Sequence, residues 1–189
     1  VTEISPDGEH TCALANGSVK CWGVDTNGPI GHNHISCGGA CNQPHGPAVV
    51  SASMVTIVTG FHHTCGIADD STLYCWGDNG FGVLTTPGDQ FQSIIAGRNT
   101  ICGITVSNEV ICWGKTSELS ENIIPPTGTT AKTVSVGRLN VCIITLQDEV
   151  DCWGVSDSSG TYGFQGLIDG PDESIATCIN GICSLPNYV

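Results

Sequence analysis

The sequence predicts an all-β fold built from one repeated unit, and three observations support this prediction. Glycine is abundant, at 25 of 189 residues, whereas charged residues make up only 12% of the chain, which is typical of short strands joined by tight turns. No stretch of eleven or more residues shows the 3.6-residue apolar period of an amphipathic helix. A Cys-Trp-Gly motif recurs four times along the chain. We expect a single repeat domain spanning residues 1–189.

Each full repeat contains two cysteines nine or ten residues apart, and the second begins the Cys-Trp-Gly motif. The first cysteines of successive copies lie 53, 37, 40 and 36 residues apart, a period typical of one β-propeller blade per repeat. We therefore expect four full blades and a truncated fifth, arranged as an open arc or as a small closed ring completed by Val1 to Ser5. The copies span about 3–32, 53–86, 92–119, 132–166 and the shortened 173–186, with an insertion at 33–48.

The cysteine spacing predicts one disulfide across each hairpin. In the first copy Asn16-Gly17 lies midway between Cys12 and Cys21, and Asn-Gly is a favoured two-residue turn because both positions need positive φ. Counting outward places the cysteines opposite each other at a non-hydrogen-bonded pair, about 4.5 Å apart at Cα and within reach of a disulfide. The predicted pairs are Cys12–Cys21, Cys65–Cys75, Cys102–Cys112, Cys142–Cys152 and Cys178–Cys183.

The other copies reach the same cysteine register by two turn lengths. The fifth copy again has Asn-Gly at its midpoint, at 180–181. Copies two to four have odd-length loops centred on Asp70, Ser107 and Gln147, which suit three-residue hairpin turns. Apolar runs at 55–58, 93–96 and 133–136 precede the first cysteines and are expected to form the inner strands of their blades.

At these residues the chain resembles the repeats of the regulator of chromosome condensation family. The pattern is glycine, two or three residues, His or Asn, a Cys-x-Leu/Ile strand, a turn and Val-x-Cys-Trp-Gly. The cysteine-bearing form is similar to secreted bacterial members and to crinkly-type receptor ectodomains of plants. The resemblance covers residues 3–32 and 53–186 and implies a β-propeller, usually of seven blades, but it does not imply one function.

Charge and cysteine content restrict the compartment and the partners. Five Lys and Arg against 18 Asp and Glu give a net charge of −13, which repels the phosphates of nucleic acids. The longest apolar stretch, 49–61, is interrupted by polar residues and too short to insert into a membrane. Twelve cysteines indicate an oxidising compartment, and a start at Val1 is expected of a mature chain after signal-peptide removal. We predict an extracellular or cell-surface location.

The insertion at 33–48 and the residue before it are unusually rich in metal-ligating side chains. A sixth disulfide, Cys37–Cys41 around a Gly-Gly turn, is the favoured interpretation. A zinc site formed by His32, His34 and His45 is the alternative, although its spacing matches no established zinc motif.

Acidic loops beginning at Asp25, Asp78 and Asp157 follow three of the Trp-Gly steps. They offer oxygen ligands for calcium, but the spaced loop with a distal Glu is absent. We expect these loops to serve as turns and predict no cofactor.

Two histidines, His10 and His63, occupy the same repeat position. Neither has a nucleophile or a partner carboxylate at catalytic spacing, so we expect a structural role for them and predict no catalytic residues and no enzyme. Asn16-Gly17-Ser18 is a candidate N-glycosylation site at a hairpin tip.

We predict a non-enzymatic structural protein, a self-assembling subunit of a fibre, filament or surface layer whose partners are copies of itself. Assembly would use blade stacking or edge-strand addition. An extracellular ligand-binding propeller, lectin-like, receptor-ectodomain-like or a protein inhibitor, is the alternative; it would bind glycans or an extracellular protein through the loops after Trp-Gly. The candidate assembly residues are Val1, Thr2, Glu3, Ile4, Leu185, Pro186, Asn187, Tyr188 and Val189.

Overall fold

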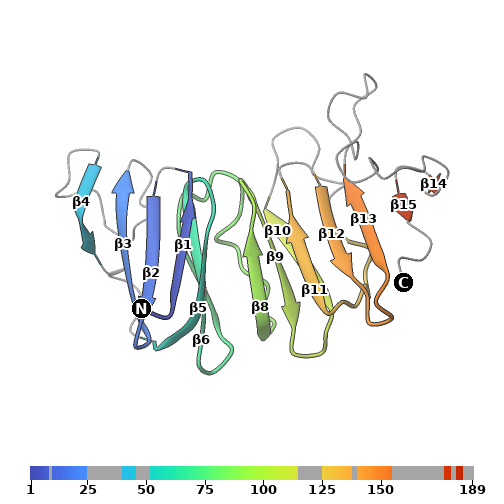
Figure 1. Ribbon diagram of the computed structural model, residues 1–189, viewed down its shortest axis with the longest axis horizontal. Helices are drawn as coiled ribbons and strands as arrows, with labels where there is room; N and C mark the ends of the chain where they lie inside the picture. Colours follow the sequence, from blue (N-terminus) through green and yellow to red (C-terminus); the bar gives the residue numbers. More distant parts are fainter. Residues whose placement is uncertain are drawn as a thin grey trace, which may run out of the picture.

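The computed structural model describes residues 1–8, 10–24, 40–45, 52–114, 125–137, 140–154, 177–179 and 182–184. These residues form β-strands joined by turns and contain no helix, which confirms the all-β prediction. The strands group into four antiparallel sheets, which follow one another as blades of an open arc (Figure 1). Within this part of the chain, no helix is long and apolar enough to cross a membrane.

Each sheet is one blade, and its strands run in chain order from the inner to the outer edge, except at the end of the fourth. The first blade contains β1 (Glu3–Asp7), β2 (His10–Ala15), β3 (Ser18–Val24) and β4 (Ala40–His45). The second contains β5 (Met54–Thr59), β6 (His63–Ala68) and β7 (Leu73–Gly77). The third contains β8 (Phe91–Ala96), β9 (Thr100–Thr105) and β10 (Val110–Gly114). The fourth contains β11 (Thr133–Val136), β12 (Asn140–Ile144) and β13 (Val150–Gly154), followed by β15 (Ile182–Ser184) and β14 (Thr177–Ile179).

The hairpin register predicted from the cysteine spacing is confirmed. In the first blade Cys12 faces Cys21 and Leu14 faces Val19, around a turn in which Asn16 and Gly17 have φ of 52° and 75°. Four of the predicted disulfides are present, each with its Cα atoms 4.0 to 4.1 Å apart. They are Cys12–Cys21, Cys65–Cys75, Cys102–Cys112 and Cys142–Cys152.

The hairpins of blades two to four close through three-residue turns, as predicted. The last turn residue, Ser71, Asn108 or Asp148, has φ of 67° in every case, the left-handed conformation this turn requires. The flanking backbone hydrogen bonds also repeat, from the amides of Ala68, Thr105 and Thr145 to the carbonyls of Thr72, Glu109 and Glu149, at 2.8 to 2.9 Å.

The shortened fifth copy forms the hairpin β14–β15, in which Cys178 faces Cys183 as the sequence predicts. However, β15 pairs with β13, so this hairpin extends the fourth sheet and does not begin a fifth one. The physical reason is the absence of the tryptophan that the full copies contain. The copy has no tryptophan to pack against the preceding blade, and an unpaired strand edge on β13 accepts it instead.

The alternative of a closed ring completed by Val1 to Ser5 is wrong. β1 pairs with β2 from Glu3 opposite Leu14 to Asp7 opposite His10, so it is the inner strand of the first blade. The molecule is therefore an open arc with the first and fourth blades at its two ends (Figure 1).

The apolar core lies between the blades, at interfaces that we call seams. Each seam joins the cysteine side of one blade to the tryptophan side of the next. Trp76 packs against Cys12 and Leu14 of the first blade, and Trp113 and Trp153 repeat this arrangement at the second and third seams. Apolar groups on both sides of each hairpin, expected from the strand pattern, are what this stacking requires.

Candidate interaction surfaces

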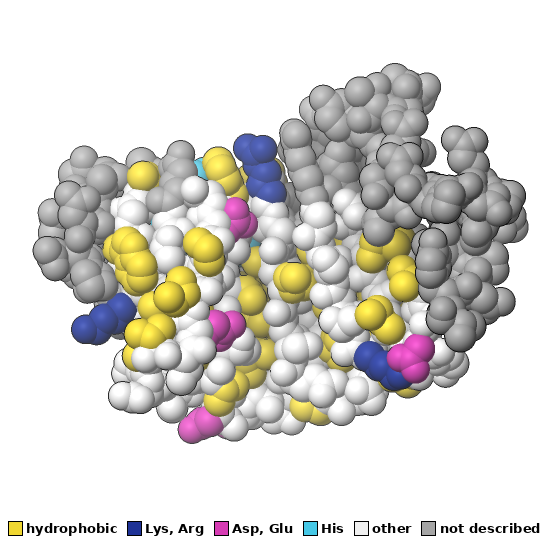
Figure 2. Space-filling model, in the orientation of Figure 1, with side chains coloured by type: hydrophobic (Ala, Val, Ile, Leu, Met, Phe, Trp, Pro, Cys, Tyr) yellow, Lys and Arg dark blue, Asp and Glu magenta, His cyan; other side chains and the backbone are white. Residues whose placement is uncertain are grey.

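The side of the first blade that faces away from the second blade carries mostly apolar side chains, which are exposed or half-buried. We call it the N-terminal end face. It includes Ile4 and Pro6 of β1, Thr11, Ala13 and Ala15 of β2, and Lys20 and Trp22 of β3, which share one side because side chains alternate along a strand and pair across it. Figure 2 shows hydrophobic side chains gathered over these three strands, with a cation beside them.

Repeat positions show how unusual this exposure is. Ile4 lies opposite Ala13, and the equivalent inner-strand residues of the next blades are Ile57, Ile94 and Val134. Ile57, Ile94 and Val134 are 0%, 9% and 9% exposed, whereas Ile4 is 61% exposed. Tryptophan follows the same trend, since Trp22 is half-buried while its three counterparts are buried.

The opposite end of the arc presents the complementary surface. The C-terminal end face is the cysteine side of the fourth blade, with Asn140, Cys142 and Ile144 of β12 and Val150 and Cys152 of β13. Cys152 is buried, and Asn140, Cys142 and Val150 are half-buried. Ile144 is 39% exposed. Its counterparts two residues after the first cysteine, Leu14, Ile67 and Ile104, are 1 to 2% exposed because the next blade covers them.

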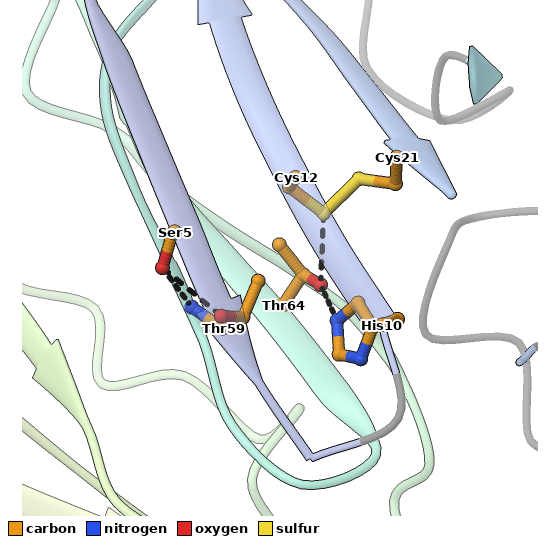
Figure 3. Close-up of a disulfide and its surroundings, with 6 residues drawn as sticks. All are labelled: Ser5, His10, Cys12, Cys21, Thr59 and Thr64. Atoms are coloured by element: carbon orange, nitrogen blue, oxygen red, sulfur yellow. Dashed lines mark hydrogen bonds between the residues drawn. A yellow bond between two sulfur atoms is a disulfide. The ribbon is translucent and has the colours of Figure 1, made fainter. Parts of the chain in front are cut away.

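The first seam adds polar contacts to its apolar core (Figure 3). The His10 Nε2 atom lies 2.8 Å from the Thr64 hydroxyl, and the Ser5 hydroxyl accepts the amide of Thr59 at 2.9 Å. The Glu3 carboxylate accepts the amide of Ile57 at 3.0 Å and the hydroxyl of Thr56 at 3.1 Å. These bonds join β1 and β2 to β5 and β6.

The two repeat-position histidines are buried and neutral. Burial lowers the pKa of His10 to about 4, and nearby His62 adds to the effect. Burial likewise lowers the pKa of His63 to about 4, assisted by His10 and His62 and opposed by Asp78.

Whether each histidine has a hydrogen-bond partner depends on the residue that precedes the first cysteine of the next blade. His10 meets Thr64 there, but the equivalent residue for His63 is Ile101, which has no hydroxyl. The His63 Nε2 atom is accordingly buried without a hydrogen bond among the described residues. The Thr100 hydroxyl likewise has no hydrogen-bond partner in the part of the chain that the structure describes, because the equivalent residue of the next blade is Val141.

The turns that join the inner strand of a blade to its second strand lie next to one another in the second and third blades. We call the surface formed there by Phe61, His62 and Arg98 the turn surface. The Phe61 amide donates to the Arg98 carbonyl at 3.3 Å, and the Arg98 guanidinium lies 4.5 Å from the centre of the Phe61 ring. His62 contacts the same ring, with centroids 4.2 Å apart. Its carbonyl accepts the amide of Asp78 at 2.8 Å, so the loop after β7 joins this turn surface.

The acidic loop after β7 is built as a turn. The Asp78 carboxylate accepts the amide of Gly80 at 2.8 Å, and the Asn79 side chain accepts the amide of Leu84 at 2.9 Å. The loop buries Val83, whose carbonyl accepts the indole of Trp113 at 2.9 Å. Among the described residues, no group of three or more His, Cys, Asp or Glu side chains is placed to hold a metal.

Several sequence candidates lie elsewhere. Asn16 is exposed at the tip of the β2–β3 hairpin, which leaves the predicted glycosylation site accessible. Of the proposed zinc ligands, His32 and His34 lie outside the described residues, and His45 is described only as backbone of β4. Of the predicted sixth disulfide, Cys37 lies outside the described residues and Cys41 is described only as backbone of β4. The acidic loop residues Asp25 and Asp157 also lie outside the described residues.

The terminal assembly candidates divide in the same way. Leu185, Pro186, Asn187, Tyr188 and Val189 lie outside the described residues. The Thr2 amide donates to the Leu14 carbonyl at 2.8 Å. Glu3 and Ile4 belong to β1, which is already paired with β2. β1 is the terminal strand of its sheet, so its edge away from β2 has no strand partner among the described residues.

Sequence reasoning missed Ile144 and the contact between Phe61 and Arg98. Ile144 could have been found by aligning the repeats and asking which copy lacks a following Trp-Gly strand. No comparable signal marks the Phe61–Arg98 pair, because it joins turns of different blades.

Comparison with known proteins agrees with this architecture. Residues 54–83 match the family described as regulator of chromosome condensation (RCC1) repeat. The fold is similar to Prp20p from Saccharomyces cerevisiae, at 17% identity and a TM-score of 0.70, over 100% of this chain and 52% of that chain.

Two plant receptor ectodomains are also similar. The entire ectodomain of the Physcomitrella patens receptor kinase CR4 is 26% identical, with a TM-score of 0.60, over 81% of this chain and 40% of that chain. The CRINKLY WD40 ectodomain of the Arabidopsis thaliana receptor kinase ACR4 is 23% identical, with a TM-score of 0.59, over 82% of this chain and 53% of that chain. This chain thus spans about half or less of these relatives. Its described strands form four successive blades of a propeller-type fold, each with one hairpin disulfide, and residues 54–83 carry the match to the RCC1 repeat.

Proposed function

We propose that this chain is a segment of a non-enzymatic extracellular propeller ectodomain that acts by binding other macromolecules. The observation that carries the proposal is the disulfide at the same hairpin position of every blade. Such bonds persist in oxidising compartments, and the similar CR4 and ACR4 chains are receptor ectodomains.

The turn surface is the proposed ligand-binding region. Arg98 is exposed and its guanidinium is held over the Phe61 ring, so its planar donors are preorganised for a carboxylate acceptor. The loop after β7 lies against the same turn through Asp78 and His62. These features favour acidic peptides or acidic sugars as ligands.

Two experiments test this function. Alkylation of the non-reduced protein followed by peptide mapping is expected to find the four hairpin pairs linked and no alkylated cysteine among them. A free thiol at these positions in protein taken from its producing cells would contradict the extracellular assignment.

Binding is tested on an array of neutral and acidic oligosaccharides and peptides. We expect Arg98→Ala and Phe61→Ala to lose binding to the acidic probes, while Val106→Asp, at an exposed hairpin tip, leaves it unchanged. Equal binding by all three variants would exclude the turn surface.

A structural role, as a self-assembling subunit of a fibre, filament or surface layer, is the second candidate. The exposed side chains of Ile4 and Ile144 on the two end faces support it, since exposed apolar patches usually mark interaction sites. In this role the partners are copies of the chain, and no cofactor takes part.

A further inference from the structure

We propose that the turn surface recognises an extended peptide segment of mixed charge, whose carboxylate binds Arg98 and whose cationic side chain binds Asp7. This inference deepens the proposed binding function and rests on it. It names a peptide, and not an acidic sugar, as the ligand. It also adds Asp7 of the first blade to the surface formed by Phe61, His62 and Arg98.

The turns of the first three blades are in direct contact, so they form one continuous strip. The Phe61 amide donates to the Arg98 carbonyl at 3.3 Å, which joins the second blade to the third. A Cβ atom at Gly8 would lie 2.7 Å from the Phe61 carbonyl oxygen. A Cβ atom at Gly60 would lie 2.7 Å from the Gly97 carbonyl oxygen. Glycine at these two positions therefore allows the backbones of neighbouring turns to pack against each other.

The register of the two inner strands β1 and β5 places Asp7 beside Phe61. The Ser5 hydroxyl accepts the amide of Thr59 at 2.9 Å. Two residues further along both strands, Asp7 reaches the level of Phe61, and it lies on the same side as Ser5 because side chains alternate along a strand. The contact of the next residue, Gly8, with the Phe61 backbone agrees with this placement.

Charged groups of opposite sign lie at the two ends of the strip. Asp7 is exposed, and its carboxylate accepts the Gly8 amide, which leaves oxygen lone pairs for a second donor. Arg98 is also exposed, and its guanidinium forms no salt bridge with a described residue. From the first blade to the third, the strip therefore presents a carboxylate, an aromatic ring and a guanidinium.

The aromatic ring of this strip is already covered, which favours a peptide over a sugar. A sugar gains most when its C–H face stacks on an open aromatic ring. The Arg98 guanidinium lies over the Phe61 ring, 4.5 Å from its centre, and the His62 ring contacts it with centroids 4.2 Å apart. The ring thus holds the guanidinium in place, and the free donors of the guanidinium are suited to a carboxylate side chain.

Long-range electrostatics favour the same ligand. The net charge of −13 repels a polyanionic glycan, whereas a peptide with balanced charges approaches without net repulsion. The two charges of such a peptide bind at opposite ends of the strip, which fixes the direction in which the peptide runs. Because both ends of the strip are exposed, the affinity is expected to fall as salt is added.

The test measures the binding of labelled, end-blocked peptides by fluorescence anisotropy. Each peptide contains a lysine and a glutamate separated by a neutral spacer, with spacers of increasing length and with both orders of the two charges. Peptides with glutamate alone and acidic oligosaccharides are the comparison probes. At the best spacer length, we expect one order of charges to bind about two- to fivefold more tightly than the reverse order.

Three variants assign the two ends of the strip. Arg98→Ala should weaken the binding of every peptide that contains glutamate by about tenfold. Asp7→Asn keeps an oxygen for the Gly8 amide but removes the charge, so it should weaken only the mixed-charge peptides, by about two- to fivefold. Asp70→Asn is the matched control, because Asp70 is also exposed and accepts a nearby amide, that of Thr72, but at the β6–β7 hairpin tip. Circular dichroism confirms that each variant folds.

The outcomes separate this proposal from the binding function on which it rests. Acidic oligosaccharides that bind through Arg98 while no peptide binds would overturn the peptide assignment and leave the binding function intact. Peptide binding that Asp7→Asn does not change would overturn the mixed-charge proposal alone. If no probe binds, or if Arg98→Ala binds as the wild type does, the proposed binding function of the turn surface fails as well.

Discussion

The first and second seams join equivalent surfaces of successive blades, yet they differ in chemistry. At the first seam the residue before the cysteine is Thr64, which meets His10, and the inner strands are tied by the Glu3 carboxylate. At the second seam the same position holds Ile101, which is fully buried in an apolar cluster with Trp113.

This difference shows that the same backbone arrangement accepts either a polar pair or an apolar side chain at this position. The two choices differ in hydrogen bonding and in hydrophobic burial. The polar seam pairs the buried imidazole. The apolar seam gains hydrophobic burial but leaves the His63 Nε2 atom without a hydrogen bond from any described residue. An unpaired buried polar group costs about 1 to 3 kcal/mol, a cost that the burial of an isoleucine offsets.

Replacing the tryptophans of the two seams should reduce stability more than any other substitution considered for the seams. Trp113 is buried and its indole donates to the Val83 carbonyl, whereas the Trp76 indole is unpaired among the described residues. We expect Trp113→Ala to lower the free energy of unfolding by about 3 to 5 kcal/mol, and Trp76→Ala to lower it by about 1 kcal/mol less. Urea unfolding measures both, and an equal or reversed order would contradict the role of the Val83 contact.

Acid is expected to weaken both seams. The folded-state pKa of His10 and of His63 is about 4, below the ordinary value near 6.5, so the unfolded chain binds protons first as the pH falls. Stability should therefore decline between about pH 6.5 and pH 4, by up to about 3 kcal/mol for each histidine.

The histidine contribution is isolated by His63→Asn, which installs the residue found at this position in the fourth blade. Unfolding midpoints measured from pH 7 to pH 4 should show roughly half of the wild-type loss. An undiminished loss in this variant would assign the acid sensitivity to other groups.

Removing the hydroxyl at the first seam tests its polar pairing. Thr64→Val keeps the shape of the side chain but leaves the His10 Nε2 atom without this partner, so we expect a loss of about 1 to 3 kcal/mol. The same substitution in a His10→Ala background should cost less. Additive effects in this double-mutant cycle would show that the two side chains are not coupled.

The reciprocal change introduces the first seam's chemistry into the second. Ile101→Thr removes apolar burial but offers a hydroxyl to His63, so its cost should be larger by about 1 kcal/mol when His63 is replaced by alanine. Chemical denaturation of the four proteins in the cycle gives this coupling. A coupling of zero would mean that the two positions do not meet across the seam.

A salt bridge outside both seams should contribute least to stability. Lys132 and Asp148 form a salt bridge of 2.6 Å with side chains 44% and 78% exposed. Exposed pairs of this kind contribute little, so Lys132→Ala should change the unfolding free energy by less than about 0.5 kcal/mol. A larger loss would point to a contribution of the Lys132 side chain beyond this pair.

The hairpin strands, their register and the four described disulfides could all be predicted from the sequence. Each depends on a turn of two or three residues between cysteines at most ten positions apart, and short turns restrict strand pairing strongly. Copy spacing and the Trp-Gly pattern likewise predicted stacked blades with apolar groups on both sides.

The contacts between blades could not be predicted from the sequence. That His10 finds Thr64, that β15 extends the fourth sheet, and that Ile4 and Ile144 are left exposed depend on contacts between segments that are distant in the chain. A hydrophobic pattern marks a surface for burial but does not identify its partner, because burial is non-directional. The partner is fixed by which blade lies next to which, and at the two ends of the arc no neighbouring blade is present within the described chain.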